Sequence, residues 1–162
     1  MDGKRVLNTL RDQKIDKIEA DMLSSFPALH LQTNDIFSEG LYAREMLIPV
    51  QSAGFEFIFL TSEVHKTEHM FYVGKGSLLV SSDDGEPVLI KAPYHGITKP
   101  GTRRVALALE DTIWTTFHAN PDNETVDQIR ERIIEKRVNP LLTEQMKQKM
   151  LQAKELFKKK IK

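Results

Sequence analysis

Apolar residues recur at helical spacing near the start of the chain, with charged residues between them. The repeat predicts an amphipathic helix over residues 4–22. Its apolar positions are Val6, Leu7, Leu10, Ile15, Ile18, Met22 and Leu23. Pro27 interrupts the pattern, and residues 27–40 are expected to form a loop that ends at Gly40. Residues 1–26 are therefore predicted to be an N-terminal helical segment.

Over residues 41–117 the pattern changes to short apolar or β-branched runs separated by turn residues. Six runs are typical of strands: LYAREMLIPV, FEFIFLTSEV, HMFYVGKGSLLVSS, PVLIKAP, RVALALE and TIWTTFHA. Asp84-Gly85 is a hairpin signal, Glu110-Asp111 is expected to turn another pair of strands, and His95-Gly96 is expected in an exposed loop. Regularly spaced short strands without a long helix between them predict an antiparallel sandwich or barrel, which we place at residues 27–122.

Helical spacing returns after residue 122. Asp122 or Asn123 is expected to cap a helix that Asn139-Pro140 ends, and Thr143 is expected to cap a second helix. The second helix carries a stripe of Met and Leu, which favours a packing face against the barrel or another subunit over a cofactor-binding stretch. Residues 123–162 are therefore predicted to be a C-terminal helical segment.

Composition narrows the class of protein. The 162 residues include no cysteine, which excludes disulfide scaffolds, thiolate zinc sites, iron–sulfur clusters and cysteine nucleophiles. Lys and Arg total 23, as do Asp and Glu, whereas a protein that coats nucleic acid is normally strongly basic. The start lacks an apolar signal region, and no apolar run is long enough to span a membrane. We therefore expect a cytoplasmic protein whose partners are neither membranes nor nucleic acid.

The zero net charge hides an asymmetry along the chain. Residues 1–122 carry 12 basic and 17 acidic residues, whereas residues 123–162 carry 11 basic and 6 acidic residues. Much of the basic excess lies in residues 158–162. A solvated helix end explains these lysines, because cations suit the C-terminus of a helix. An electrostatic contact with an acidic body or a neighbouring subunit is the alternative.

The stretch TSEVHKTEHMFYVGKGSLLV carries two ligand-type residues two positions apart, a third four positions later, and a short run to a glycine turn. This pattern resembles the first motif of cupins, a family of small double-stranded β-barrels. The resemblance places Glu63, His65 and His69 on the three ligand positions. In the second cupin motif a histidine follows a proline–glycine turn; here the turn looks like Lys99-Pro100-Gly101, and the histidine position falls on Arg104. The usual four-ligand set is therefore incomplete.

A closer resemblance covers roughly residues 37–135. The runs LYAREMLIP, VHKTEHMFYVGKG, IKAP and KPGTRRVALALEDTIWTTFH look like those of cupin-like proteins of phages and prophages. The resemblance implies a mainly β fold, a single cupin-type double-stranded β-helix (jelly-roll barrel) with an N-terminal helix and C-terminal helices. It also implies a homodimer, which apolar runs such as FEFIFL support, and a phage or bacterial setting. It implies no established reaction.

Histidines on two predicted strands are candidate metal ligands. Alternate side chains of a barrel strand point inward, so His69 and His118 converge with His65 if both strand faces point inside. Three imidazoles, or two with Glu63, would bind one divalent metal such as Zn²⁺, Fe²⁺, Mn²⁺ or Ni²⁺. The alternative is that the histidines of the barrel interior are neutral and hydrogen-bonded, without a metal.

Four other side chains are candidates for binding a ligand. Arg104 offers a forked donor to a carboxylate or phosphate, and Trp114 offers a face to a ring. Tyr42 and Arg44 lie on one strand and either line the mouth of the pocket or form a polar sheet face. Arg104 could instead pair with acidic residues across a hairpin, and Trp114 could belong to the core.

Three functions remain open from the sequence. The favoured one is a small-molecule-binding cupin-like protein with a pocket lined by His, Glu and Arg, whose ligand is anionic. The alternative is a metal-dependent cupin enzyme of dioxygenase, isomerase or lyase type, in which His65 and His69 hold a metal that acts as a Lewis acid or activates oxygen. The third is a structural or assembly protein that oligomerises through its helices.

Overall fold

The computed structural model describes residues 3–81 and 86–161. The hairpin predicted at Asp84-Gly85 lies outside these residues. Contacts divide the chain into two compact units, one made of Met1–His30 with Arg137–Lys162 and the other of Leu31–Lys136. The first unit is helical, and the second contains every strand of the described residues.

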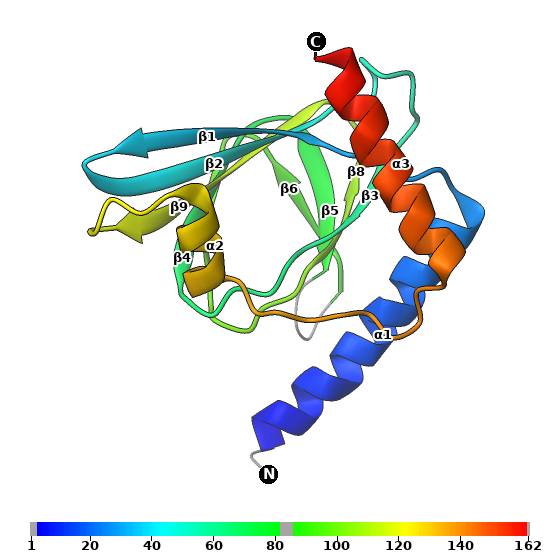
Figure 1. Cartoon of the computed structure of the whole chain (residues 1–162), viewed down its shortest axis with the longest axis horizontal. Helices are drawn as coiled ribbons and strands as arrows, with labels where there is room; N and C mark the ends of the chain where they lie inside the picture. Colours follow the sequence, from blue (N-terminus) through cyan, green and yellow to red (C-terminus); the bar gives the residue numbers. More distant parts are fainter. Residues whose placement is uncertain (1–2, 82–85, 162) are drawn as a thin grey trace. The chain divides into compact units, whose positions relative to one another are not determined.

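The strands of the second unit form two antiparallel sheets (Figure 1). One sheet has the strand order β1-β2-β9-β4-β7, and the other has the order β3-β8-β5-β6. The strands are β1 (Gln32–Ser38), β2 (Gly40–Ile48), β3 (Ile58–Thr61), β4 (His69–Lys75), β5 (Ser77–Ser81), β6 (Val88–Lys91), β7 (Tyr94–Thr98), β8 (Val105–Ala108) and β9 (Thr112–Asn120).

The pairing of the strands defines the topology. β2 pairs with β9, β3 with β8, β4 with β7, and β5 with β6, all antiparallel. This nested order is that of one long two-stranded ribbon rolled onto itself, the arrangement of a double-stranded β-helix or jelly roll. The helices are α1 (Gly3–Ser25) before the strands, and α2 (Val126–Ile133) and α3 (Glu144–Lys160) after them. The predicted fold class is therefore confirmed.

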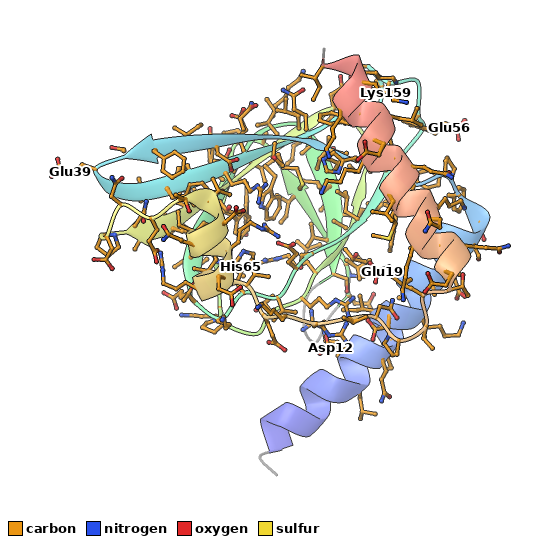
Figure 2. The ribbon with its side chains drawn as sticks, viewed as in Figure 1. Asp12, Glu19, Glu39, Glu56, His65 and Lys159 are labelled. Atoms are coloured by element: carbon orange, nitrogen blue, oxygen red, sulfur yellow. The ribbon has the colours of Figure 1, made fainter. Side chains whose placement is uncertain are left out.

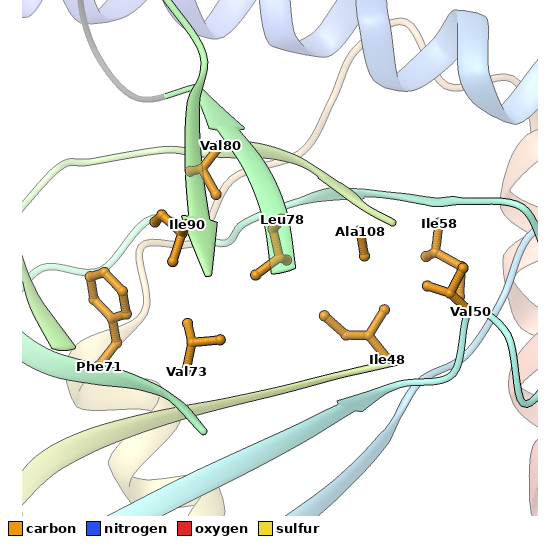
Figure 3. Packing of buried hydrophobic residues seen from close by; sticks show 9 residues of the cluster. All are labelled: Ile48, Val50, Ile58, Phe71, Val73, Leu78, Val80, Ile90 and Ala108. Atoms are coloured by element: carbon orange, nitrogen blue, oxygen red, sulfur yellow. The ribbon is translucent and has the colours of Figure 1, made fainter. Parts of the chain in front are cut away.

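Side chains from both sheets meet in an apolar core (Figure 3). Neighbouring residues of a strand face opposite sides. In β4, His69, Phe71 and Val73 are therefore buried, whereas Met70, which lies between His69 and Phe71, is exposed. Burial of each large apolar side chain stabilises the fold by about 1.5–3 kcal/mol. The same inward face of β4 carries His69. The core residues are Ile48, Val50, Ile58, Phe71, Val73, Leu78, Val80, Ile90 and Ala108.

Two strands lie where the sequence predicted loops. The prediction of a loop over residues 27–40 is wrong, because the segment contains β1. The loop predicted at His95-Gly96 is also wrong, because both residues belong to β7. The two segments are polar or contain glycine, so their own strand preference is weak. Pairing of β1 with β2 and of β7 with β4 makes them strands.

The start of α2 differs from the prediction as well. Thr125, rather than Asp122 or Asn123, is the N-cap of this helix. Its side chain accepts a hydrogen bond from the Gln128 amide, and the Gln128 side chain accepts one from the Thr125 amide at 2.9 Å. This capping box satisfies two amides that the first turn of a helix leaves without partners.

The end of α2 falls before the predicted break at Asn139-Pro140. The helix ends at Ile133, and Ile134 is already extended. Ile134 forms an isolated antiparallel bridge with His65. The chain leaves the helix early because its backbone pairs with the segment that precedes β4.

Polar contacts hold α1 and the C-terminal segment of the helical unit together. Thr143 caps α3 as predicted. Asp16 of α1 is buried and accepts two hydrogen bonds from Arg137, at 2.6 and 2.8 Å. Asn139 donates to the Asp16 carbonyl at 3.0 Å, and Lys149 of α3 donates to two carbonyls at the end of α1. Within residues 3–81 and 86–161, no helix is long and apolar enough to cross a membrane.

Candidate metal centre

Three histidines of the barrel come together, and we call them the histidine cluster. His69 is the first residue of β4, and His118 lies near the end of β9, which is beside β4 in the sheet. His65 precedes β4. One ring nitrogen from each histidine lies within 4.8 Å of the others. The sequence predicted that the three would converge if the strand faces of His69 and His118 both point inside, and the structure brings all three to one place.

The segment of His65 is held by the chain that leaves α2. His65 forms its bridge with Ile134, and Figure 2 shows it beside α2. The backbone amides of Lys66 and Glu135 donate across this bridge at 2.7 and 2.8 Å. These bonds fix a short irregular segment against the barrel. The third histidine therefore depends on α2, although α2 contributes no side chain to the histidine cluster.

The three rings pack closely in a buried space. The ring centroids of His65 and His69 are 4.3 Å apart, and those of His69 and His118 are 4.6 Å apart. The rings of His65 and His118 are stacked at 5.3 Å, only 11° from parallel. His69 and His118 are buried, and His65 is partly buried. Three imidazoles that face one another in a largely buried space are a typical metal-ligating set.

Burial controls the charge of the histidine cluster. It lowers the pKa of His65 to about 4 and that of His118 to about 3, and the neighbouring histidines lower both further. Burial also lowers the pKa of His69. The charged form is disfavoured because each ring has lost most of its hydration and faces other basic rings. All three are therefore neutral near neutral pH, the form that binds metals.

One nitrogen of the cluster has no partner in the described residues. Nδ1 of His118 is buried and makes no hydrogen bond there, while Nε2 lies 3.1 Å from the Thr116 hydroxyl. A buried nitrogen without a partner is costly, and a metal would satisfy it. The histidine cluster thus fits a metal.

Glu63 is not part of the histidine cluster. Its carboxylate accepts a hydrogen bond from Arg130 of α2, with which it forms an ion pair. The negative charge of Glu63 still acts on His65, whose pKa it raises against the larger effect of burial. The fourth candidate metal ligand therefore contributes charge near the cluster rather than a place beside the three imidazoles.

Arg104 and Trp114 lie together in the barrel with Phe71. The rings of Phe71 and Trp114 are stacked 4.3 Å apart and 7° from parallel. The guanidinium of Arg104 lies over both rings, 5.0 Å from the Phe71 centroid and 5.8 Å from that of Trp114. Such cation–π contacts stabilise a partly desolvated arginine. The charge of Arg104 also reaches the histidine cluster, because it lowers the pKa of His69 after burial.

Tyr42 and Arg44 lie on β2, and their side chains contact residues of the neighbouring strand β1. Tyr42 is buried and its ring stacks on His118, while its hydroxyl donates to Asp35 at 2.6 Å. Burial and this bond raise the pKa of Tyr42 well above its usual range. Arg44 lies 3.6 Å from the same carboxylate and donates to Thr33 at 3.2 Å. These two residues support the histidine cluster from one side.

Positive charge surrounds the histidine cluster. Burial is the largest cause of the low histidine pKa values, and nearby arginine charges act in the same direction. The one carboxylate that acts against them, that of Glu63, is paired with an arginine. Three of these arginines are ion-paired, Arg44 with Asp35, Arg130 with Glu63 and Arg132 with Glu124, so their charges are partly offset. The arginines concerned are Arg44, Arg104, Arg130 and Arg132.

Two residues near the site escaped the sequence analysis. Asp35 was missed because its strand, β1, was taken for a loop. Arg130 lies on α2, and nothing in its local pattern shows that it binds Glu63, which lies 67 residues away. A helix that docks on the strands can be recognised from an apolar stripe, but its polar partners depend on tertiary structure.

Comparisons with known proteins give structural similarity only. No known family matches the chain, and no curated protein does either. KdgF from Halomonas sp. is 16% identical over 57% of this chain and 82% of its own, with a TM-score of 0.43. An RmlC-like cupin from Methanocaldococcus jannaschii is 12% identical over 59% of this chain and 86% of its own, with a TM-score of 0.42. The Schizosaccharomyces pombe Cnp3 cupin domain is 16% identical over 68% of this chain and 71% of its own, with a TM-score of 0.44.

Cupin or RmlC-like proteins recur among these solved structures. At such low identities and TM-scores they say nothing about what this chain binds. The fold rests instead on the nested strand pairing, and the phage setting stays a prediction.

Proposed function

We propose that the chain binds one divalent transition metal at the histidine cluster and that the metal, together with Arg104, holds a small anionic ligand. The observation that carries the proposal is the convergence of three imidazoles, with one nitrogen of each within 4.8 Å of the others. Three neutral imidazoles suit Zn²⁺, Fe²⁺ or Ni²⁺ better than Mn²⁺, which prefers carboxylates. When bound, such a metal supplies a Lewis acid to the ligand.

Charge is the reason for an anionic ligand. Three neutral imidazoles leave the double charge of a metal uncompensated, in an interior that already holds arginine charges. Glu63 cannot offset it fully because it is engaged with Arg130. A carboxylate or phosphate supplied by the ligand would offset the charge of the metal and accept hydrogen bonds from Arg104. The rings of Phe71 and Trp114 would contact its apolar part.

Metal content tests the first half of the proposal. Protein purified without a histidine tag should contain close to one metal per chain by inductively coupled plasma mass spectrometry. His65→Ala, His69→Ala and His118→Ala should each lose it. His95→Ala is the matched control, because His95 is exposed on β7 and pairs with Tyr72 on the face away from the core. Metal-free wild type after incubation with Zn²⁺, Fe²⁺ and Ni²⁺ would overturn the metal site.

Linkage between metal and anion tests the second half. If the anion binds beside the metal, each raises the affinity of the other by the same factor. We expect acetate, benzoate or inorganic phosphate to bind the metal-loaded protein in calorimetry and to bind the metal-free protein much more weakly. Equal anion binding with and without metal would contradict a ligand held by the metal. It would leave Arg104 and the neutral histidines as a metal-independent anion pocket.

The same site fits the metal-dependent enzyme that the sequence left open. A metal with three protein ligands keeps a position free for a reacting group. Turnover of the bound anion, followed by product analysis, separates the enzyme from the binding protein. We propose binding because the guanidinium of Arg104, whose charge acts on His69, offers a forked donor to an anion.

A further inference from the structure

Three buried side-chain atoms on the inward face of the five-stranded sheet make no hydrogen bond within the described residues. They are Nε of Arg44, Oγ1 of Thr98 and Nδ1 of His118. A carboxylate oxygen of Asp35 lies 3.6 Å from Nε of Arg44, and a metal would satisfy Nδ1 of His118. The Thr98 hydroxyl is thus the one atom of the three that neither a neighbouring charge nor the proposed metal accounts for.

Thr98 is the last residue of β7, and it lies beside the histidine cluster. Its direct cross-strand partner is His69 of β4, and directly opposed residues of an antiparallel pair point to the same face. Only 2% of Thr98 and 6% of His69 are exposed. The hydroxyl is therefore buried about one strand spacing, roughly 4.8 Å, from the strand that carries His69. At this place it is within reach of a group that the histidine cluster holds.

The chain that follows Thr98 runs past two other parts of the site. The amide of Gly101 donates to the His65 carbonyl at 2.9 Å. Three residues further on, the amide of Arg104 donates to the Ser62 hydroxyl at 2.7 Å, and its carbonyl accepts from the Ser62 amide at 2.9 Å. These bonds fix the segment against the chain that leads into β4. The Thr98 hydroxyl and the Arg104 guanidinium thus belong to one segment held beside the histidine cluster.

A buried hydroxyl without a hydrogen bond is unusual, because its removal from water costs free energy that no other contact returns. Thr112 of β9 shows the usual case in the same barrel. It is as buried as Thr98, at 2%, and its hydroxyl donates to the Glu110 carbonyl at 2.7 Å. The Thr98 hydroxyl would gain the corresponding bond from a ligand that supplies an oxygen at this place.

We propose that the Thr98 hydroxyl donates a hydrogen bond to the anion held at the histidine cluster, and that the site therefore takes acids with two or more oxygens on one centre, carboxylates and phosphates. The inference rests on the proposed function, because it adds a donor to the same anion site. An ionised carboxylate only accepts hydrogen bonds, so the hydroxyl must donate. Such an anion can bind at the metal and Arg104 through one oxygen and still offer another to Thr98.

Substitution of Thr98 by valine keeps the branched shape of the side chain and removes the hydroxyl. In calorimetry on metal-loaded protein, Thr98→Val should bind benzoate about tenfold or more weakly than the wild type, as expected for one hydrogen bond to a charged group. Thr98→Ser keeps the hydroxyl and should bind benzoate with close to the wild-type affinity. Metal content should be unchanged in both variants. N-methylimidazole, a neutral metal ligand without an oxygen, should bind both like the wild type.

Stability in the absence of any ligand is an independent measurement. In metal-free protein, in a buffer without carboxylate or phosphate, Thr98→Val should raise the urea midpoint because it removes a buried hydroxyl that has no partner. Thr112→Val is the matched control. It removes a hydrogen bond that the structure contains, so its urea midpoint should fall while its benzoate affinity stays at the wild-type level. This comparison needs neither metal nor anion, so it tests the surroundings of Thr98 separately from the proposed function.

The outcomes separate this inference from the proposed function. Equal benzoate affinity in Thr98→Val and wild type overturns the inference and leaves the proposed function in place. A urea midpoint of Thr98→Val below that of the wild type also overturns it, since the hydroxyl then has a structural partner. Equal weakening of benzoate and N-methylimidazole overturns it too, because the variant has then changed the whole metal site. Wild-type protein that binds neither metal nor benzoate overturns both.

Discussion

The ring of Tyr42 stacks on the ring of His118, with centroids 5.9 Å apart and planes 27° from parallel. The two residues are direct cross-strand partners on β2 and β9. The Tyr42 hydroxyl donates to Asp35 of β1 at 2.6 Å, so the tyrosine is held at both ends. The orientation of one candidate metal ligand therefore depends on a strand that contributes no ligand.

Substitution of Tyr42 separates packing from hydrogen bonding. Tyr42→Phe loses the bond to Asp35 and should lower the free energy of unfolding by about 1–2 kcal/mol, with metal content unchanged. Tyr42→Ala also leaves a cavity against His118 and should cost about 3–5 kcal/mol. Urea unfolding measures both. Loss of metal in Tyr42→Phe would mean that the hydroxyl, rather than the ring, positions the histidine.

Arg104 should determine affinity for anions but not for the metal. Arg104→Lys keeps the charge but loses the planar fork and its stacking over Phe71. We expect the affinity for benzoate to fall about tenfold or more, while metal content stays at the wild-type level. Calorimetry on the metal-loaded proteins measures the change. Unaltered benzoate affinity in Arg104→Lys would show that the anion binds elsewhere.

The fold could be predicted from the sequence wherever strands carry their own signal. β4, β8 and β9 have alternating or continuous apolar residues with strong strand preference, and each lies where it was predicted. β1 and β7 have little such preference and depend on their neighbours. The strand partners of β7 lie 21–29 residues away along the chain, so local pattern does not encode that pairing, whereas those of β1 lie only 3–15 residues away across a tight turn.

In the candidate site, too, some residues could be placed from local pattern and others depend on tertiary contacts. His69 and His118 could be placed because a strand alternates with a period of two, so a buried face predicts which side chains point inward. Glu63 fits the motif position as well as His65 does, yet it turns to Arg130 on α2. The choice between a metal and an arginine depends on how α2 docks, which neither spacing nor residue type reveals.

Acid should destabilise the metal-free protein. The pKa of His65 is about 4 and that of His118 about 3 in the folded state, against about 6.5 for a free imidazole. As the pH falls below about 6.5, the unfolded chain takes up protons that the folded chain does not, so the free energy of unfolding falls. Each histidine contributes at most about 1.4 kcal/mol per pH unit in this window, and nothing above it.

Urea unfolding of chelator-treated protein between about pH 7.5 and pH 5 measures this slope. His118→Gln cannot take up the proton in either state, so its stability should depend less steeply on pH. His95→Gln, at an exposed position, should keep the wild-type slope. A flat profile in the wild type, or equal slopes in His118→Gln and wild type, would contradict neutral buried histidines.

The ion pair of Asp16 and Arg137 should stabilise the helical unit without affecting the histidine cluster. Arg137→Ala leaves a buried carboxylate without its bidentate partner, a change that costs on the order of 3 kcal/mol. All three histidines lie in the unit Leu31–Lys136, so metal content should not change. Hydrogen exchange should accelerate in α1 and α3 and stay slow in β4 and β9. The double variant Asp16→Asn with Arg137→Ala should recover part of the protection, because it removes the buried negative charge. Equal loss of protection in the strands, or loss of metal, would show that the two units unfold as one.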